Sequence, residues 1–352
     1  MKADPIEVKI THFKQQLPVE MDRFWSSSEN KMGLQQMFIS WMIECCRSEI
    51  PVFLGGANTD DITSCLKLCN GERSVVPSLS NDHEEADDRI MYHVSQSISE
   101  ERFEKVIVAS PDTDVFVCSV YHFKRWIFNG LNELWVVSGR SGTTVAFPVH
   151  DLAERIAPEV IDILPAVHAL TGCDTTSKIG TKTAALKVAS GSCFGELSFF
   201  GVSTLNEELV DLAQHFMVHC ISKDKDVTTF DQLRNKIYYK KSQLLDLEKL
   251  PPTSSSAILH IKRAYLQMYV WLHAPFVRSI DIDPTHYGYV LDEEGDCLKP
   301  KITEDDVLPD DLPQPCNCLK CARANVCICR INNINCCQYC NCKREECQNP
   351  FG

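Results

Sequence analysis

Apolar residues recur with alternating helical and strand periods from residue 81 to residue 190 of the chain. Apolar positions three to four apart predict helices, and short β-branched runs predict buried strands. The segment is therefore predicted to form helices over 84–98, 150–156 and 164–170 and strands over 105–109, 134–137 and 144–148, with a further apolar run over 115–121. Helices and strands that alternate at this spacing predict an α/β unit with a largely parallel sheet flanked by helices.

The segments on either side of this region have other patterns. Residues 35–47 show helical periodicity, and residues 51–56 predict a short strand that ends in a glycine turn. Residues 190–275 are mainly helical in pattern, and their clearest helix, 257–273, follows a capping segment rich in Pro and Ser. Asp, Glu and Pro are frequent over 283–312, which predicts an extended or linking segment.

A length of 352 residues is sufficient for two or three compact units. The patterns divide the chain into five predicted parts. They are an N-terminal helical or irregular segment (1–80), an α/β core (81–190), a helical extension (191–281), an acidic linker (282–315) and a small cysteine cluster (316–349).

The composition restricts the class of protein. A formal net charge of −13 argues against a surface that coats nucleic acid in general. The chain has no run of about 20 uncharged apolar residues, the length needed to span a bilayer. Its N-terminus lacks the apolar core of a secretory signal. We therefore expect an intracellular protein with no membrane partner.

Three short acidic motifs contain six carboxylates in an order that suggests a site for two divalent ions. They are Glu85, Asp87 and Asp88 near a predicted helix start, Asp112 and Asp114 after the predicted strand 105–109, and Asp174 after a Thr-Gly pair. Metal-dependent phosphodiester hydrolysis needs several carboxylates around two ions about 3.5–4 Å apart, and Mg²⁺ or Mn²⁺ is the expected ion. A purely structural role without metal stays open for these motifs, because acids favour helix starts and Pro-Asp sequences favour turns.

The three motifs resemble those of the flap-endonuclease and bacterial 5′-nuclease group of the PIN-like superfamily. Glu85-Ala86-Asp87-Asp88 is similar to the acidic helix start of that group, Asp112-Thr113-Asp114 to its Asp-x-Asp strand end, and Gly172-Cys173-Asp174 to its Gly-x-Asp segment. The resemblance, over about residues 80–190, implies a divalent-metal-dependent, structure-selective nuclease with the six acids as catalytic ligands. It also implies a helical hairpin that clamps the DNA backbone, whose matching residues are Lys178, Gly180, Thr181 and Lys182.

The chain departs from that group before the acidic helix. Members also take carboxylates from a first and a second strand, whereas the predicted strand 51–56 ends in glycines. Ser177 stands where a further acid often follows the third motif. Two interpretations stay open: the chain carries only the later half of a nuclease domain, or it is a copy that keeps the fold without the chemistry. The layout, including residues 168–174, also resembles an uncharacterised family of animal proteins with mobile-element-like genes.

Ten of the 19 cysteines lie between residues 316 and 347. In an intracellular protein such a cluster indicates zinc rather than disulfides. Cysteine pairs with one intervening residue indicate sulfurs that are shared between ions. So short a segment lacks an apolar core of its own and is expected to fold only with its metal. The nine scattered cysteines are expected to be small buried hydrophobes.

The cysteine cluster resembles one copy of the tesmin-like CXC domain. The resemblance implies about three zinc ions and nine ligands, all of the cluster except Cys337. The ligands are Cys316, Cys318, Cys321, Cys327, Cys329, Cys336, Cys340, Cys342 and Cys347. In that family a tyrosine just before the second Cys-x-Cys reaches into DNA, and Val326 stands there in this single copy. The local charge is positive, which favours phosphate contact.

Two functions from different classes follow from these motifs. The first is a nuclease that uses Mg²⁺ or Mn²⁺, with the zinc module holding DNA. The second is a catalytically inactive, zinc-containing module that binds nucleic acid or protein. The expected partner is DNA, with RNA as the alternative, and the expected location is the nucleus. A zinc-stabilised scaffold with no nucleic-acid role is the third and plainest interpretation.

Overall fold

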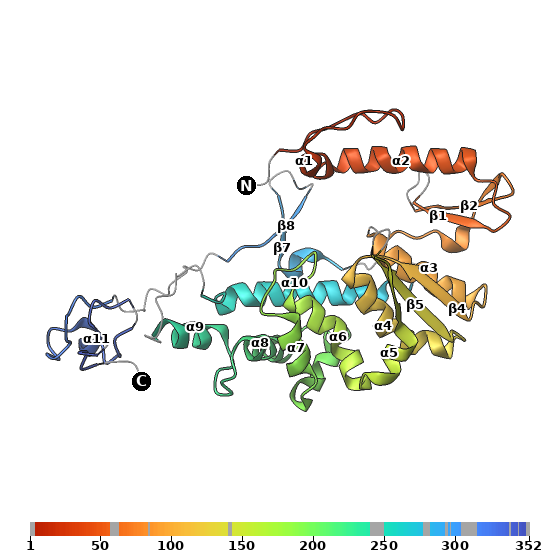
Figure 1. Ribbon diagram of the computed structural model, residues 1–352. Helices are drawn as coiled ribbons and strands as arrows, with labels where there is room; N and C mark the ends of the chain where they lie inside the picture. Colours follow the sequence, from red (N-terminus) through yellow and green to blue (C-terminus); the bar gives the residue numbers. More distant parts are fainter. Residues whose placement is uncertain are drawn as a thin grey trace. The chain divides into compact units, whose positions relative to one another are not determined.

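The computed structural model describes residues 4–56, 63–83, 85–139, 143–239, 250–276, 282–292, 295, 297–303, 315–337, 339–343 and 345–349. The protein is mixed α/β, with small sheets and a C-terminal cysteine-rich cluster (Figure 1). It forms two compact units. Unit 1 comprises Met1–Val108, Arg125–Glu133 and His273–Ile280, and unit 2 comprises Ala109–Lys124, Leu134–Leu272 and Asp281–Gly352.

Unit 1 begins with two helices and an antiparallel sheet. The helices are α1 (Met21–Trp25) and α2 (Ser28–Cys45), and the strands are β1 (Val52–Gly55), β2 (Cys65–Cys69) and β3 (Glu72–Val75), in the order β1-β2-β3. The predicted helix and the predicted first strand are present. The sequence interpretation missed the β2–β3 hairpin, although its two-residue loop is Asn70-Gly71. Both residues have positive φ, 52° and 80°, which is the backbone that Asn-Gly favours in a tight hairpin.

Helix α3 (Ala86–Ser99) follows the short 3₁₀ turn η1 (Pro77–Leu79). The predicted helix 84–98 is present but begins at Ala86. Glu85 is the extended residue before it, and Glu84 lies outside the described residues. The buried apolar face of α3 consists of Met91, Tyr92, Val94 and Ile98. The first turn therefore carries the acidic residues, while the later turns pack into the core.

A second sheet has the strand order β4 (Lys105–Ala109), β5 (Glu133–Ser138) and β6 (Val145–Pro148). Backbone bonds join Glu133 to Glu104 at one end and Ser110 to Val137 at the other, so β4 and β5 run parallel. Strands β5 and β6 are antiparallel. All three strands were predicted, but a largely parallel sheet was not correct. The connection between β5 and β6 is too short for the crossover that a parallel pair requires.

The helices that follow α3, up to α10, lie largely in unit 2 (Figure 1). They are α4 (Thr113–Phe128), α5 (Val149–Arg155), α6 (Pro158–Thr171), α7 (Lys182–Ala189), η2 (Ser192–Phe199), α8 (Glu207–Ile221), α9 (Phe230–Tyr239) and α10 (Ser254–His273). The apolar run 115–121 is helical, and its Val115 and Val120 are buried. On α10, Ile261 and Met268 are fully buried.

The segment expected to be an extended linker contains regular structure. A 3₁₀ turn, η4 (Pro284–Tyr287), precedes the antiparallel hairpin of β7 (Tyr289–Leu291) and β8 (Leu298–Pro300). Tyr287 stacks on Tyr265 of α10 with ring centroids 5.4 Å apart. Residues 304–314 lie outside the described part of the chain. In the described regions, none of the helices combines the length and apolar character needed to cross a lipid bilayer.

Candidate metal sites

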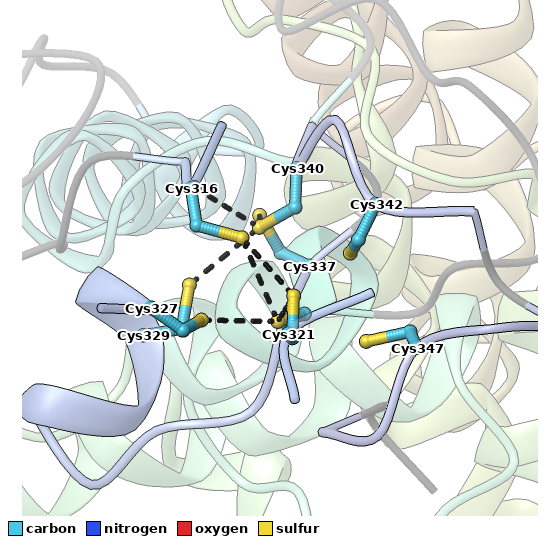
Figure 2. Close-up of a cluster of buried hydrophobic side chains, with 9 residues drawn as sticks. Cys316, Cys321, Cys327, Cys329, Cys337, Cys340, Cys342 and Cys347 are labelled. Carbon is cyan, nitrogen blue, oxygen red and sulfur yellow. Dashed lines mark hydrogen bonds between the residues drawn. The ribbon is translucent and has the colours of Figure 1, made fainter. Parts of the chain in front are cut away.

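The C-terminal module, Cys316–Cys347, has a core made of sulfur. Nine of its cysteines are buried, namely Cys316, Cys321, Cys327, Cys329, Cys336, Cys337, Cys340, Cys342 and Cys347, and Cys318 packs against them. Figure 2 shows thiols from separate parts of the module directed toward one another. Its one helix among the described residues, α11 (Ile328–Ile331), is four residues long. The module therefore depends on its cysteines for an interior.

The distances between the sulfurs fit tetrahedral zinc. Sγ of Cys336 lies 3.4 Å from that of Cys321, 3.8 Å from Cys316 and 4.0 Å from Cys327. Four sulfurs at about 2.3 Å from one zinc ion lie about 3.8 Å from one another. A disulfide would bring its two sulfurs to about 2.05 Å. All ten cysteines are free thiols, and the clustered cysteines can hold zinc.

Three overlapping groups of four sulfurs lie within metal-sharing distance. The groups are Cys316-Cys327-Cys329-Cys336, Cys316-Cys321-Cys336-Cys342 and Cys316-Cys318-Cys321-Cys327. Cys316 belongs to all three. A thiolate that is shared counts as a ligand of two ions, so several four-coordinate zinc ions can be held by fewer than four cysteines per ion in total.

The chain path that gathers these thiols is held by backbone hydrogen bonds at both ends. The amide of Asn341 donates to the carbonyl of Cys316 (2.9 Å), and the amide of Cys336 donates to the carbonyl of Asn349 (2.8 Å). The Asn349 side chain also donates to the carbonyl of Ile334 (2.8 Å). Cys321 has a φ of 52°, a left-handed turn after the first Cys-x-Cys pair. These bonds bring the chain around Cys316 to that around Asn341, and the chain around Cys336 to that around Asn349.

As free thiols, these cysteines have strongly perturbed pKa values. Burial raises the pKa of Cys321 and of Cys336, and the neighbouring Cys337 thiol raises that of Cys340. At Cys327 burial acts in the same direction, but N–H groups and neighbouring thiols lower the pKa to about 7. Zinc binds thiolates and displaces their protons. The bound ion therefore compensates the buried negative charge that raises the pKa values of the free thiols.

Cys337, which the sequence interpretation excluded, belongs to the sulfur cluster. Its side chain is 2% exposed, and its Sγ lies 3.7 Å from that of Cys340. Nothing in the sequence indicates that the thiols of two adjacent cysteines both point inward. Val326, at the position of the DNA-reading tyrosine, is 59% exposed.

The acids of helix α3 lie in unit 1. Glu85 is the residue before the helix and is exposed, and its side chain makes no capping hydrogen bond. Asp87 is half-buried and Asp88 is 4% exposed. Burial, and then the charges of Asp87 and Glu85, raise the pKa of Asp88 to about 7. Asp88 is therefore not an ordinary solvated acid of a first helical turn, because its surroundings favour the protonated carboxyl over the charged one.

Asp112 and Asp114 lie in unit 2. Asp112 stands between β4 and α4, and Asp114 is in the first turn of α4. The Ser110 hydroxyl accepts from the amide of Asp112 (3.1 Å), and Oδ1 of Asp112 accepts from the amide of Asp114 (2.8 Å). Asp112 thus makes a turn, as a Pro-Asp sequence favours, and it also lines a cavity of about 220 Å³. The cavity is lined by Ser110, Pro111, Asp112, Thr113, Phe116, Val136, Ser138 and Phe147.

Asp114 is 8% exposed and has a histidine partner. Nε2 of His168, on the last turn of α6, lies 2.7 Å from its Oδ1. On the other side of the ring, Nδ1 of His168 lies 2.8 Å from Nζ of Lys182. The sequence interpretation assigned His168 no role, because nothing in its spacing connects it to Asp114.

The predicted nucleic-acid-binding residues surround the start of α7. Thr181 caps the helix by accepting from the amide of Ala184 (3.2 Å), and Lys178 is exposed. Gly180 has a φ of 71°. The Lys182 ammonium donates to His168 and to the carbonyl of Gly172. Desolvation lowers the pKa of Lys182, and the charges of Cys173 and Asp114 oppose this effect. Lys182 is therefore engaged within the protein.

Asp174 is exposed in the turn between Cys173 and Thr176, which form an isolated bridge. It is absent from the groups of described His, Cys, Asp and Glu residues whose ligand atoms converge closely enough to hold an ion. Its motif contributes structure instead, through the hydroxyl of Thr176, which accepts from the amide of Cys173 (3.0 Å).

Comparison with known proteins adds no assignment to these sites. No family model, curated protein or solved structure matches the chain.

Proposed function

We propose that this chain is a zinc-dependent nucleic-acid-binding protein whose C-terminal module makes the contact. The observation that carries the proposal is the convergence of ten thiols between residues 316 and 347 at separations suited to shared zinc ions. Resemblance to a tesmin-like CXC domain supports about three zinc ions and DNA as the partner, with RNA as the alternative. A DNA-binding role would take the protein to the nucleus.

The basic residues of the module differ in their availability for phosphate. Arg330 donates to the carbonyls of Cys321 and Ala322, and Lys320 pairs with Glu346 at 3.1 Å. Arg323 and Lys343 are exposed. We therefore assign phosphate contact to Arg323 and Lys343, and a structural role to Arg330.

The test is the affinity of the full chain for a labelled DNA duplex, measured by fluorescence anisotropy at several salt concentrations. Arg323→Gln with Lys343→Gln is expected to weaken binding and to reduce the salt slope by about one for each lost contact. Lys301→Gln removes an exposed cation outside the module and serves as the control. Equal affinity and slope in the double variant and the control would contradict the proposal. A single-stranded RNA of the same length distinguishes the alternative partner.

A second candidate function is a Mg²⁺- or Mn²⁺-dependent nuclease of PIN-like fold. The parallel pair β4–β5, with Asp112 and Asp114 directly after β4, supports this candidate, as does the buried carboxylate of Asp88. Against it, β1 ends in Gly55 and offers no carboxylate of the kind that such nucleases take from a first strand.

Isothermal titration with Mn²⁺ tests this candidate in the full chain and in Asp112→Asn/Asp114→Asn. Binding that the double variant lacks would support the cation site, and cleavage assays on flap and duplex DNA would follow. Separate Glu85→Gln, Asp87→Asn, Asp88→Asn and Asp174→Asn variants show which other acids take part. Absence of binding in the unaltered chain would exclude the nuclease and leave the zinc-dependent binding function.

A further inference from the structure

A histidine in unit 2 connects a buried carboxylate to a lysine ammonium. Oδ1 of Asp114 and Nε2 of His168 are 2.7 Å apart, and Nδ1 of His168 and Nζ of Lys182 are 2.8 Å apart. Asp114 is 8% exposed and His168 is 6% exposed. The three residues form an array, Asp114–His168–Lys182. Lys182 is exposed, and its ammonium is bound to His168.

The donors and acceptors determine which ring nitrogen of His168 carries the proton. The ammonium of Lys182 has three N–H donors and contacts three acceptors, which are Nδ1 and the carbonyl of His168 and the carbonyl of Gly172. Because Nδ1 accepts from an ammonium, it holds no proton. The ring proton is therefore on Nε2, from which it is donated to Asp114.

The backbone around Gly172 makes this arrangement specific. Gly172 ends α6 with a φ of 111°, and a Cβ added there would lie 2.7 Å from Cα of Lys178. Only glycine can take this conformation without displacing the neighbouring chain. The turn directs the Gly172 carbonyl to the Lys182 ammonium, and the Thr181 cap sets Lys182 as the first residue of α7.

The array engages only one of the two oxygens of Asp114. The amide of Asp114 is bound by Asp112, and within the described part of the chain no donor contacts Oδ2 of Asp114. A charge-assisted bond to one oxygen fixes the plane of a carboxylate and therefore the direction of the other oxygen. Carboxylates that bind metals are themselves oriented by such hydrogen bonds.

We propose that His168 and Lys182 are positioning residues that hold Oδ1 of Asp114 so that Oδ2 is presented to a divalent cation. This inference rests on the cation site of the second candidate function and assigns roles to two residues outside the acidic motifs. It also gives Lys182 a role in the cation site in place of phosphate binding. Trp271, whose ring lies 5.8 Å from that of His168, supports the imidazole without a hydrogen bond to it.

The experiment compares three variants of the full chain. His168→Phe keeps a ring but removes the donor, His168→Gln keeps an N–H donor, and Lys182→Met removes the ammonium. Free Mn²⁺ is measured by electron paramagnetic resonance, and ring ¹⁵N chemical shifts of labelled histidine report the tautomer. His215→Phe is the matched control, because His215 packs on Phe194 and His219, away from the array.

The expected results are an Nε2-protonated ring and a Mn²⁺ affinity that falls about 10–100-fold in His168→Phe. His168→Gln should recover most of the loss, and Lys182→Met should move the Nδ1 resonance and weaken binding less. A purely structural role would lower thermal stability in His168→Phe without changing Mn²⁺ affinity.

Three outcomes would overturn the inference in distinguishable ways. An Nδ1-protonated ring in the unaltered chain would refute the array itself, and this measurement needs no variant to fold. Mn²⁺ binding that depends on Asp112 and Asp114 but is equal in His168→Phe and Lys182→Met would refute positioning and keep the cation site. No Mn²⁺ binding by the unaltered chain would remove the cation site and the inference together.

Discussion

Sγ of Cys316 lies 3.8 Å from Sγ of Cys336, although 20 positions separate them in the chain. The separation is that of two corners of a zinc tetrahedron and not that of a disulfide. Cys316 also lies 3.5 Å from Cys321, so one thiol adjoins ligands from two parts of the module. A shared ligand of this kind makes the module sensitive to single substitutions.

Cys316→Ser is therefore expected to lower the zinc content and unfold the module. It removes a member of all three sulfur groups, and a metal-dependent fold loses stability with its metal. Zinc per chain is measured by elemental mass spectrometry, and folding by protease resistance of the C-terminal region. Cys297→Ser, an exposed cysteine outside the module, is the control. Full zinc content in Cys316→Ser would contradict the shared role.

Asp88 should make stability fall as the pH rises. Burial and the charges of Asp87 and Glu85 raise its pKa from 3.8 to about 7 in the folded chain. Between these values the folded state keeps a proton that the unfolded state has lost, so the contribution to stability present at low pH is lost as the pH approaches 7. A tenfold difference in proton affinity between the folded and unfolded states corresponds to about 1.4 kcal/mol of unfolding free energy.

Asp88→Asn should flatten this pH dependence in urea unfolding carried out without added divalent ions. Added Mn²⁺ should have the same effect on the unaltered chain if the carboxylate meets a cation. Asp211→Asn, on the exposed face of α8, leaves the slope in place. An unchanged slope in Asp88→Asn would show that another group causes it.

Gly172→Ala should destabilise the protein more than Gly130→Ala. Both glycines have positive φ, 111° and 105°, so both substitutions carry backbone strain of about 1–3 kcal/mol. Only at Gly172 would the new Cβ meet backbone, 2.7 Å from Cα of Lys178, while at Gly130 no atom lies within 4 Å. Thermal unfolding measures the stability lost in each variant. The difference between the two losses is the cost of the close contact, because the backbone strain is common to both. Equal losses would mean that the turn at Gly172 can relax.

Lys178→Gln should weaken DNA binding if the segment before α7 contacts the phosphate backbone. Lys178 is exposed, whereas Lys182 is engaged with His168 and Gly172. The expected change is a lower affinity and a salt slope reduced by about one. Lys187→Gln, an exposed residue in the last turn of α7, is the comparison. An identical effect of both variants would indicate a general charge effect.

Local patterns predicted much of the secondary structure. Apolar spacing was sufficient for α3, β4, β5 and α10, because these elements depend on which face of a short segment is buried. The direction of β6 was not predicted, since it depends on the length of the connection and not on the pattern of the strand. The β2–β3 hairpin was missed although Asn70-Gly71 carries a strong turn signal.

The sequence by itself determined the cysteine-rich module, because ten thiols within a short segment cannot lie far apart. It also located the acidic motifs at element ends. Only the tertiary structure decided that Asp88 is buried, that Asp114 meets His168, and that the Lys182 ammonium contacts His168. The physical reason is that desolvation and hydrogen bonding depend on residues 14 to 54 positions away, whose approach is set by the packing of whole helices.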